Sequence, residues 1–489
     1  MKKSILIFVA LFVGTVIQAQ TVSDALRLSS YQIGGTARTV GVGGSMSALG
    51  TDFATIAINP AGLAQYRKSE FSITPTLLVT DTESALTEGS FTPLSTDSRT
   101  NFNLNNLGVV FARRPRASRW KTANFALGFN RIANFNRKFF YEGSSEGSIV
   151  DRFQEQANAN DSLDPFESEL AFNAGALLCC DDDNLYVSDV ELAPPGAEIF
   201  RDELVTTRGS INEILIGFAG NYDDKISIGA TIGIPIITYT EERIYREEDQ
   251  GTSFDGDIPF FDELEYGYNL TTTGAGLNLK LGFIYRLNQM FRFGFSAHTP
   301  SIFWLDDSFN ANLAYEFTED NESFRGEETS PDGIFDYQLR TPWRLIASTG
   351  IVIGKYGFIS GEVEWVDYTN LQFDLGQETD TERFINRAIE EDLSAAINAR
   401  LGGEIAIERF RVRAGINFLQ SAIEGDDSFN TAYSFGAGIR ERSFFLDFAY
   451  RITQVEENYF PYTTAETPIQ VIDNSINNNQ FMLTAGFRF

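Results

Sequence analysis

The sequence predicts an all-β fold, a 14-stranded antiparallel β-barrel that crosses a membrane. Three observations predict it: an export signal with no helical anchor, long and short connections that alternate, and strands with one apolar face. The last ten residues show the strand pattern clearly, because every second residue from Phe481 to Phe489 is apolar. A tilted strand of about ten residues with this alternation can cross the hydrocarbon core. Alone, it would also suit the last strand of a soluble sandwich.

The chain begins with an export signal. Two lysines precede an apolar run from Ile5 to Ile17, and Ala19 is the small residue expected at a cleavage site. This run is shorter than the roughly 20 residues that a membrane helix needs. We therefore predict a signal peptide over residues 1–19. No later stretch is apolar enough for a membrane helix, so the exported chain is either free outside the cytoplasm or a β-barrel.

Composition narrows the possible partners. The 43 Phe, 18 Tyr and 41 Gly suit aromatic girdles and glycine-tolerant strands. The formal charge of −29 argues against nucleic acid, because phosphates require Lys and Arg. Such an acidic surface fits solvated extracellular loops better than a metal site. The two cysteines, Cys179 and Cys180, are neighbours, which rarely bond to each other because the geometry is strained.

Short and long connections between strands alternate along the chain. The short ones are Tyr222–Lys225, Leu287–Met290, Gly354–Lys355, Glu408–Arg409 and Glu441–Arg442. The long, acidic ones are Thr80–Thr100, Gly143–Thr207, Glu247–Leu264, Thr318–Gly333, Leu375–Leu393 and Tyr459–Asn477. Outer-membrane barrels have tight periplasmic turns and long external loops, whereas a soluble sandwich has no reason to sort its loops in this way.

The strands between these connections have one apolar face and one face that carries the charges. Phe410, Val412 and Ala414 oppose Arg411 and Arg413. A lysine or arginine on the lipid face at mid-membrane would cost about 2–4 kcal/mol, so charges should face the lumen. We predict strands at 69–79, 101–113, 121–141, 208–222, 225–245, 265–287, 290–317, 334–353, 356–374, 394–408, 410–424, 428–440, 443–457 and 478–489. Several exceed what the bilayer requires and would extend outside as a collar.

Residues 20–65 do not alternate. They are rich in glycine and small side chains, which suits close packing in a confined space. A phosphate-binding loop is not indicated, because there is no G-K-[ST] and no preceding strand.

This segment carries a resemblance. Gly35–Arg38, Gly43–Ser45 and above all Asn59-Pro60-Ala61-Gly62 resemble the start of the FadL family. Further likenesses are Gly274–Asn278 with Phe293–Ser296 and Thr299-Pro300, and Glu362–Trp365 with Tyr368. The resemblance implies a hatch over residues 20–66 that plugs an outer-membrane barrel over residues 67–489, in a monomer. The final strand, ending in Phe489, looks like the signal by which the barrel-assembly machinery inserts such proteins.

The resemblance also implies a function: uptake of hydrophobic small molecules such as long-chain fatty acids or aromatic hydrocarbons. Ligand would be captured among the external loops and leave sideways into outer-membrane lipid, where the third strand kinks beside the hatch motif Asn59, Pro60, Ala61 and Gly62. Gly128 is the candidate for the kink, or an ordinary small residue in a strand.

The loop Gly143–Thr207 would contain the capture surface. Its candidate residues are Phe172, Leu177 and Leu178, although a loop that buries its own apolar side chains explains them equally well.

The sequence leaves other functions open. Five arginines could bind a fatty-acid carboxylate, but none forms an evident basic pair: Arg38, Arg131, Arg286, Arg411 and Arg413. Haem uptake would need an axial ligand, for which His298 is the single histidine. A barrel that docks or shuttles secreted proteins, as PorV-like relatives do, would use the acidic loops. An enzyme is not indicated: we expect no catalytic residues, no metal and no cofactor, because one histidine allows no Ser-His-Asp grouping.

Overall fold

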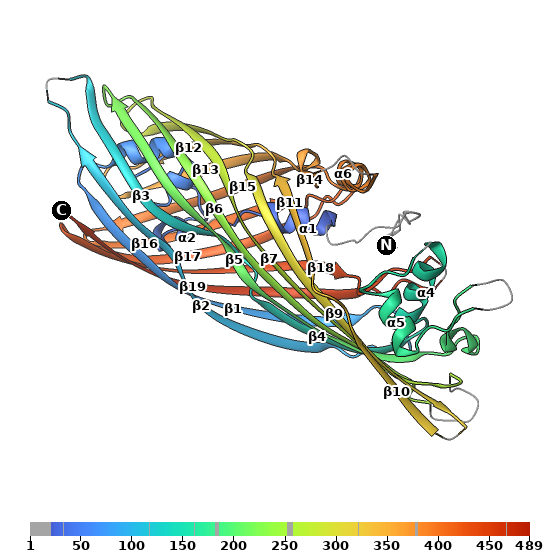
Figure 1. Cartoon of the computed structure of the whole chain (residues 1–489). Helices are drawn as coiled ribbons and strands as arrows, with labels where there is room; N and C mark the ends of the chain where they lie inside the picture. Colours follow the sequence, from blue (N-terminus) through green and yellow to red (C-terminus); the bar gives the residue numbers. More distant parts are fainter. Residues whose placement is uncertain are drawn as a thin grey trace.

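The computed structural model describes residues 21–32, 34–116, 118–160, 162–180, 185–251, 258–320, 322–376, 380–465 and 467–489. The predicted signal peptide, residues 1–19, lies outside these residues. The described chain forms a closed antiparallel barrel with a helical N-terminal segment inside it (Figure 1). β1 (Glu70–Leu86) pairs with β19 (Ile472–Arg488) from Glu70 opposite Arg488 to Leu86 opposite Ile472, which closes the sheet on itself.

Nineteen β segments in the described residues make up fourteen wall strands, as predicted. Strand three consists of β3 and β4, strand seven of β8 and β9, strand eight of β10, β11 and β12, and strand nine of β13 and β14, because each set pairs in succession with the same neighbours. The remaining bounds are β2 (Ser95–Arg113), β3 (Trp120–Asn134), β4 (Arg137–Ser145), β5 (Ile199–Tyr222), β6 (Ile226–Glu248), β7 (Phe261–Arg286), β8 (Phe291–His298), β9 (Ile302–Glu319), β10 (Glu322–Thr329), β11 (Gly333–Arg340), β12 (Arg344–Val352), β13 (Gly357–Asp367), β14 (Gln372–Asp374), β15 (Ala395–Ile407), β16 (Phe410–Gln420), β17 (Phe429–Arg440) and β18 (Phe444–Tyr459).

The two faces of the wall differ as the alternation predicts. On β18, Leu446 and Phe448 are exposed on the outer face, whereas Asp447 between them is fully buried. On β16, Val412 is exposed and Arg413 is buried. A strand has a period of two, so this register turns Asp447 and Arg413 inward and leaves their apolar neighbours on the outside.

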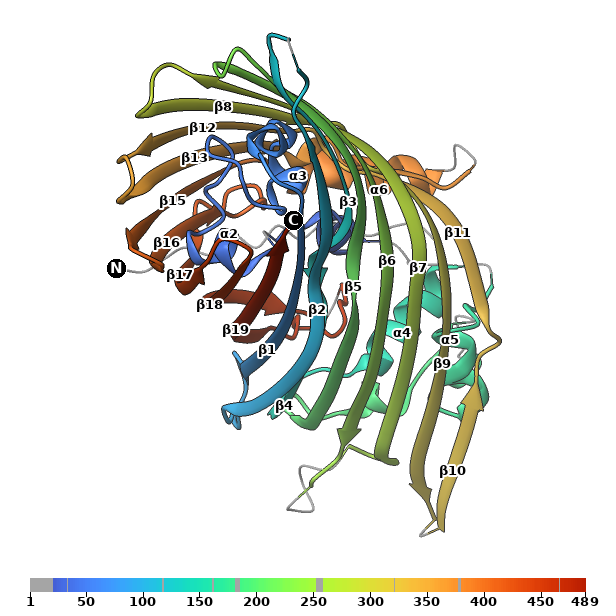
Figure 2. The ribbon, with the colours of Figure 1, turned by 90° about the vertical axis from the view of Figure 1, so that its left-hand side faces the viewer.

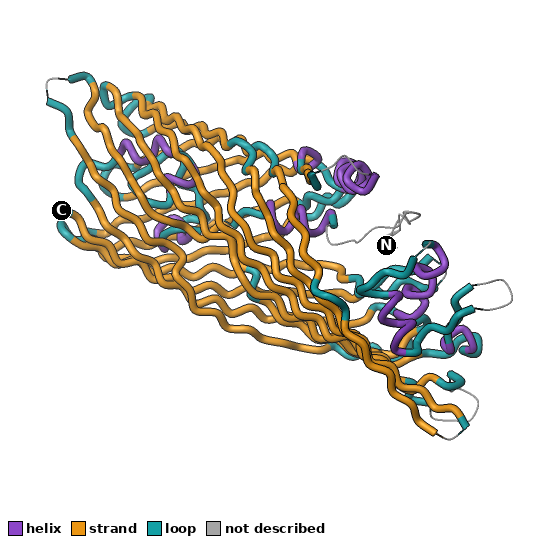
Figure 3. Tube along the Cα trace, viewed as in Figure 1, coloured by secondary structure: helices purple, strands orange, loops and turns teal. Residues whose placement is uncertain are grey.

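One side of the barrel is much taller than the other. β5, β6 and β7 have 24, 23 and 26 residues, whereas about 9–11 residues suffice to cross the hydrocarbon core. The excess forms the expected collar at the end opposite Phe489 (Figures 1 and 3). Two short helices, α4 (Ile149–Ala159) and α5 (Ser168–Ala174), pack against this collar, together with η2 (Asp189–Leu192).

The segment before β1 folds inside the barrel (Figure 2). It contains α1 (Val22–Ser29), α2 (Ala37–Gly41), α3 (Thr55–Ile58) and η1 (Pro60–Gln65), and we call residues 21–66 the hatch segment. At the external rim, η3 (Tyr368–Asn370) lies between β13 and β14, and α6 (Asp380–Asp392) follows β14. Among the described residues, no helix has both the length and the apolar character needed to cross a bilayer.

Cys179 and Cys180 are bonded to each other in the loop after α5. Neighbouring cysteines rarely bond to each other, so this pairing differs from what the sequence indicates.

Candidate functional site

The Asn59 side chain connects the hatch segment to the wall. It is fully buried, and its Nδ2 donates to the Ser47 carbonyl oxygen at 2.9 Å and to that of Phe283 on β7 at 3.3 Å. Its Oδ1 accepts from the Ala61 amide at 3.1 Å, which caps η1, while Pro60 occupies the first position of that helix. Proline suits this position because its missing N–H would have no helical partner.

Glycines in the wall allow this close contact. A Cβ on Gly282 would overlap Asn59 Oδ1, and a Cβ on Gly229 would lie 2.5 Å from the carbonyl carbon of Pro60. Gly62 packs in the same way against Thr55 and Gly50 inside the hatch segment. Other lumen-facing glycines meet hatch atoms around the barrel: Gly108, Gly128, Gly217, Gly294, Gly350, Gly402 and Gly415. The hatch segment is therefore fitted to the backbone of the wall.

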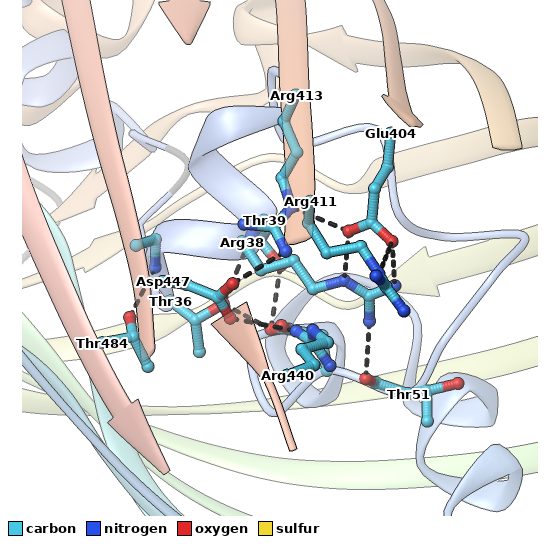
Figure 4. Close-up of polar contacts among 12 residues, drawn as sticks. Thr36, Arg38, Thr39, Thr51, Glu404, Arg411, Arg413, Arg440, Asp447 and Thr484 are labelled. Atoms are coloured by element: carbon cyan, nitrogen blue, oxygen red, sulfur yellow. Dashed lines mark hydrogen bonds and ion pairs between the residues drawn. The ribbon is translucent and has the colours of Figure 1, made fainter. Parts of the chain in front are cut away.

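A buried ion pair attaches the hatch segment to strand ten, and the charge network continues along the wall to strand thirteen (Figure 4). Arg38 of α2 pairs with Glu404 of β15 at 3.1 Å and donates to the Thr51 carbonyl oxygen at 2.9 Å. Arg413 pairs with the same glutamate and with Asp447, both at 2.7 Å. Charges of alternating sign thus neutralise one another in the lumen, where an unpaired charge would be costly.

The backbone ladder between strands two and three is incomplete. β2 and β3 pair from Arg113 opposite Ala123 to Asn106 opposite Asn130. Within the described residues, strand three then makes no ladder pair with β2, and the next contact of this kind is the bridge between Phe91 and Ser144.

Side chains span this gap instead. The Asn134 Nδ2 lies 3.4 Å from the Asn101 Oδ1, and the Lys138 Nζ lies 2.8 Å from the Asp97 Oδ1. The wall is therefore held here by two side-chain contacts in place of a ladder of backbone hydrogen bonds.

Strand three breaks at Phe135 and Asn136, and the expected kink at Gly128 is misplaced. Gly128 pairs regularly with Gly108 and Leu215, and it lacks a side chain because the Phe53 ring packs against it. At the true break, the Phe135 amide donates to the Gly209 carbonyl oxygen at 3.0 Å.

After the break, β4 turns into the barrel. Phe139 and Tyr141 are buried in a cluster with Leu86 of β1 and Ile472 of β19. The inward course of β4 explains why β2 has no partner along the gap.

The hatch segment reaches this gap from inside. The Gln32 amide donates to the Ile132 carbonyl oxygen at 2.7 Å, and the Asn105 Nδ2 donates to that of Gly35 at 2.9 Å. Gly34 lies directly against the Arg131 carbonyl oxygen. The start of the hatch segment therefore lines the one stretch of wall where strands two and three separate.

Above the hatch motif, α1 packs in an apolar cluster with side chains of the wall. Ala25 and Leu28 pack with Ile211, Ile237 and other wall side chains, and Arg27 lies 3.9 Å from the centroid of the Tyr239 ring. The expectations from the sequence do not include this helix. Its signal is a capping box from Thr21 to Asp24 before an amphipathic octapeptide.

The three candidate residues of the capture loop differ in solvent exposure. Leu177 is 1% exposed in the core beneath α4 and α5, so it stabilises the loop itself. Phe172 and Leu178 are 37% and 50% exposed, and Phe172 packs edge-on against Tyr186. Only the latter two face solvent, near the exposed Leu185.

All five candidate arginines have hatch or wall partners. Arg38, Arg411 and Arg413 share Glu404, while Arg286 donates to Gln65 at 3.0 Å and Arg131 to Asn212 at 3.1 Å.

His298 also has a partner. It is 5% exposed, and its Nε2 lies 2.8 Å from the Ile58 carbonyl oxygen. That nitrogen is therefore used to hold the hatch segment, which argues against His298 as a haem ligand.

Searches with protein-family models and with curated sequences find no match to this chain. Comparison of the structures does find relatives. A FadL homologue from Pseudomonas aeruginosa aligns over 94% of this chain and 100% of its own, with a TM-score of 0.55 and 12% identity.

Two further structures align as completely. The toluene transporter TodX of Pseudomonas putida covers 94% of this chain and 100% of its own (TM-score 0.52, 12% identity). The monoaromatic hydrocarbon channel CymD covers 94% and 99% (TM-score 0.51, 13% identity). The chain therefore has the fold of the FadL homologue and of the hydrocarbon channels TodX and CymD.

Proposed function

We propose that this protein is an outer-membrane channel for the uptake of hydrophobic small molecules. Residues 20–66 act as its hatch, residues 67–489 as the barrel, and residues 1–19 direct export. Cargo binds outside among the loops, enters the lumen above the hatch and leaves sideways between strands two and three. The apolar outer wall, the inward charges and the fold shared with FadL-type and hydrocarbon channels support this proposal.

One observation carries the proposal: the backbone ladder between strands two and three is incomplete, and the hatch segment occupies the lumen beside it. The hatch segment contacts the wall backbone around the barrel, which leaves little room for a straight path to the periplasm. Between Asn130 and Ser144, by contrast, only side chains span strands two and three. A sideways exit returns an apolar molecule to hydrocarbon without contact with water, which is the favourable direction of transfer.

The external end offers a place for capture. Phe172, Leu178 and Leu185 expose apolar surface on a loop whose core is well packed, so the surface is presented on a rigid support. Such exposed apolar surface on a loop fits a ligand that binds by burial. The cargo class is hydrophobic, with long-chain fatty acids and aromatic hydrocarbons as the first candidates.

A reversible cross-link across the gap tests the exit. Asn101→Cys and Asn134→Cys are combined in a background with Cys179→Ser and Cys180→Ser, since the two native side chains lie within 3.4 Å. Oxidation, or a short bis-maleimide, joins the strands, and whole-cell uptake of labelled oleate and labelled toluene is measured. Uptake should fall to that of cells lacking the protein and recover on reduction of the oxidised form.

The matched control places the same two cysteines where the ladder is complete. Thr431→Cys and Gln454→Cys sit opposite each other on β17 and β18, so joining them should leave uptake unchanged. Unchanged uptake after cross-linking across the gap would overturn the sideways exit. If deletion of the protein changes no hydrophobic uptake and secreted proteins co-purify with it, the docking function is favoured instead.

A further inference from the structure

The outer wall carries an apolar groove that the proposed transport path does not use. It lies across β7, β8, β12 and β13 and has a volume of about 570 Å³. Its sides are Phe283, Phe295, Leu345 and Trp365, and its bottom is opened by two small residues, Ala297 and Ala347. In the strand pairing, Ala297 stands opposite Leu345 and Ala347 opposite Phe295, so the two alanines form a diagonal trench between larger side chains.

Apart from the indole N–H of Trp365, the side chains of the groove offer no hydrogen bond to an occupant. The one hydroxyl in its lining, that of Ser296, points inward and lies 2.7 Å from the Ile58 carbonyl oxygen in the hatch segment. The other side chains present carbon surfaces, apart from the Trp365 indole N–H, and Gly282 presents its backbone. An occupant with several polar groups would leave most of them unpaired there, which is costly. The chemistry therefore selects a hydrocarbon chain.

The position of the groove identifies the side of the membrane. Its strands are joined by the short turns Leu287–Met290 and Ile353–Tyr356, which lie at the same end of the barrel as Phe489. That end is the periplasmic side in the proposed orientation, so the groove opens into the periplasmic leaflet.

A cation lies in the turn that joins two of the groove strands, at their periplasmic end. Lys355 is exposed in the turn between β12 and β13, the two strands that form one side of the groove, and its Nζ lies 5.5 Å from the Tyr356 ring centroid. From Lys355 to Val363 in the groove is eight residues, about 26 Å of strand or about 19 Å of depth at a tilt of about 45°. Half of a bilayer with its head groups is about 20–22 Å. The two lengths match.

We propose that this groove binds one acyl chain of a glycerophospholipid from the periplasmic leaflet, with its phosphate beside Lys355. The narrow trench suits one chain better than the convex wall of a second barrel. The inference needs the membrane location but not transport, so it stands or fails independently of the sideways exit.

Photo-cross-linking in lipid nanodiscs tests it. The purified full-length mature protein is reconstituted in phosphatidylethanolamine with a minor fraction of phosphatidylglycerol. A trace of phosphatidylethanolamine carries a diazirine near the end of one chain. After illumination, cross-linked peptides should concentrate in residues 281–297 and 345–365. Ala347→Trp, which fills the trench, should lose most of these cross-links.

The matched control is Ala437→Trp, an exposed outward alanine on β17, which should keep them. Lys355→Gln changes only an exposed turn, so it keeps the test valid if Ala347→Trp does not fold; it should lower the yield about fivefold. Cross-links spread evenly around the barrel would overturn the inference. So would covalent dimers through the groove, or displacement of the lipid probe by free oleate alone.

Discussion

Neutralising Glu404 should release the hatch segment from the wall. This carboxylate is 6% exposed and pairs with Arg38 at 3.1 Å, Arg413 at 2.7 Å and Arg411 at 3.7 Å. Glu404→Gln keeps the shape and removes the charge. Arg413 keeps Asp447 as a partner at 2.7 Å, whereas Arg38 loses its carboxylate in the lumen.

The expected magnitude follows from these contacts. Breaking a buried pair by removing one partner costs about 3–5 kcal/mol. We take the lower end, about 3 kcal/mol, because Arg38 keeps its hydrogen bond to the Thr51 carbonyl oxygen. That value multiplies the equilibrium constant for hatch release by on the order of 100.

A buried cysteine in the hatch segment provides the assay. Ser45→Cys in the background without Cys179 and Cys180 places a small thiol at a fully buried position. Its rate of reaction with a maleimide then reports the fraction of released hatch. We expect Glu404→Gln to raise this rate on the order of 100-fold.

A second glutamate provides the control. Glu441 pairs with Arg409 at 3.6 Å on an exposed turn, so Glu441→Gln should change the free energy by less than about 1 kcal/mol and leave the labelling rate nearly unchanged. Equal labelling rates in the wild-type protein and in Glu404→Gln would refute the assigned role of Glu404.

Three further outcomes are expected. Gly282→Val should displace the hatch motif, because its Cβ would overlap Asn59 Oδ1; labelling at position 45 should rise, whereas Gly361→Val, where the nearest atoms lie 4.0 Å away, should have little effect. Burial raises the pKa of Asp151 in α4 to about 6, so the protonated form is favoured in the fold: the stability of α4 should decrease as pH rises from about 4 to 7. A spin label on α4 should report more motion at the upper pH, and Asp151→Asn should abolish the change. Deletion of Phe489 should lower the amount of protein in the outer membrane while the surviving protein keeps its substrate preference, as measured by immunoblot and uptake.

The wall could be predicted from the sequence because its signals are local. A period of two, inward charges such as Arg413 and Asp447, and alternating loop lengths depend only on neighbouring residues, and they yield the fourteen strands seen in the structure. The Asn59-Pro60-Ala61 motif likewise marks the turn that seats the hatch segment.

The gap could not be predicted in the same way, because its causes lie far apart in the chain. At the break, Phe135 donates to the Gly209 carbonyl oxygen of strand four, and just before it Ile132 accepts from Gln32 of the hatch segment. Gly128 is an isolated glycine in a strand, a pattern that predicts a kink. Its absent side chain instead makes room for Phe53, about 75 residues earlier in the chain. The placement of α1 in the lumen also depends on the assembled wall, since its apolar residues have no nearby partners in the sequence.

The seam between the first and last strands has a consequence for how the protein assembles. Arg488 and Glu70 meet across a separation of 418 residues, so closing this seam costs the most chain entropy and should come last. The Ala37 amide donates to the Thr484 hydroxyl at 2.7 Å, and that hydroxyl lies 2.8 Å from the hydroxyl of Thr74 on the opposite side of the seam. A segment already bound to the last strand thus presents the first strand with its partner. The N-terminal residues then serve as an internal template for barrel closure. They must therefore lie in the lumen before the first and last strands pair.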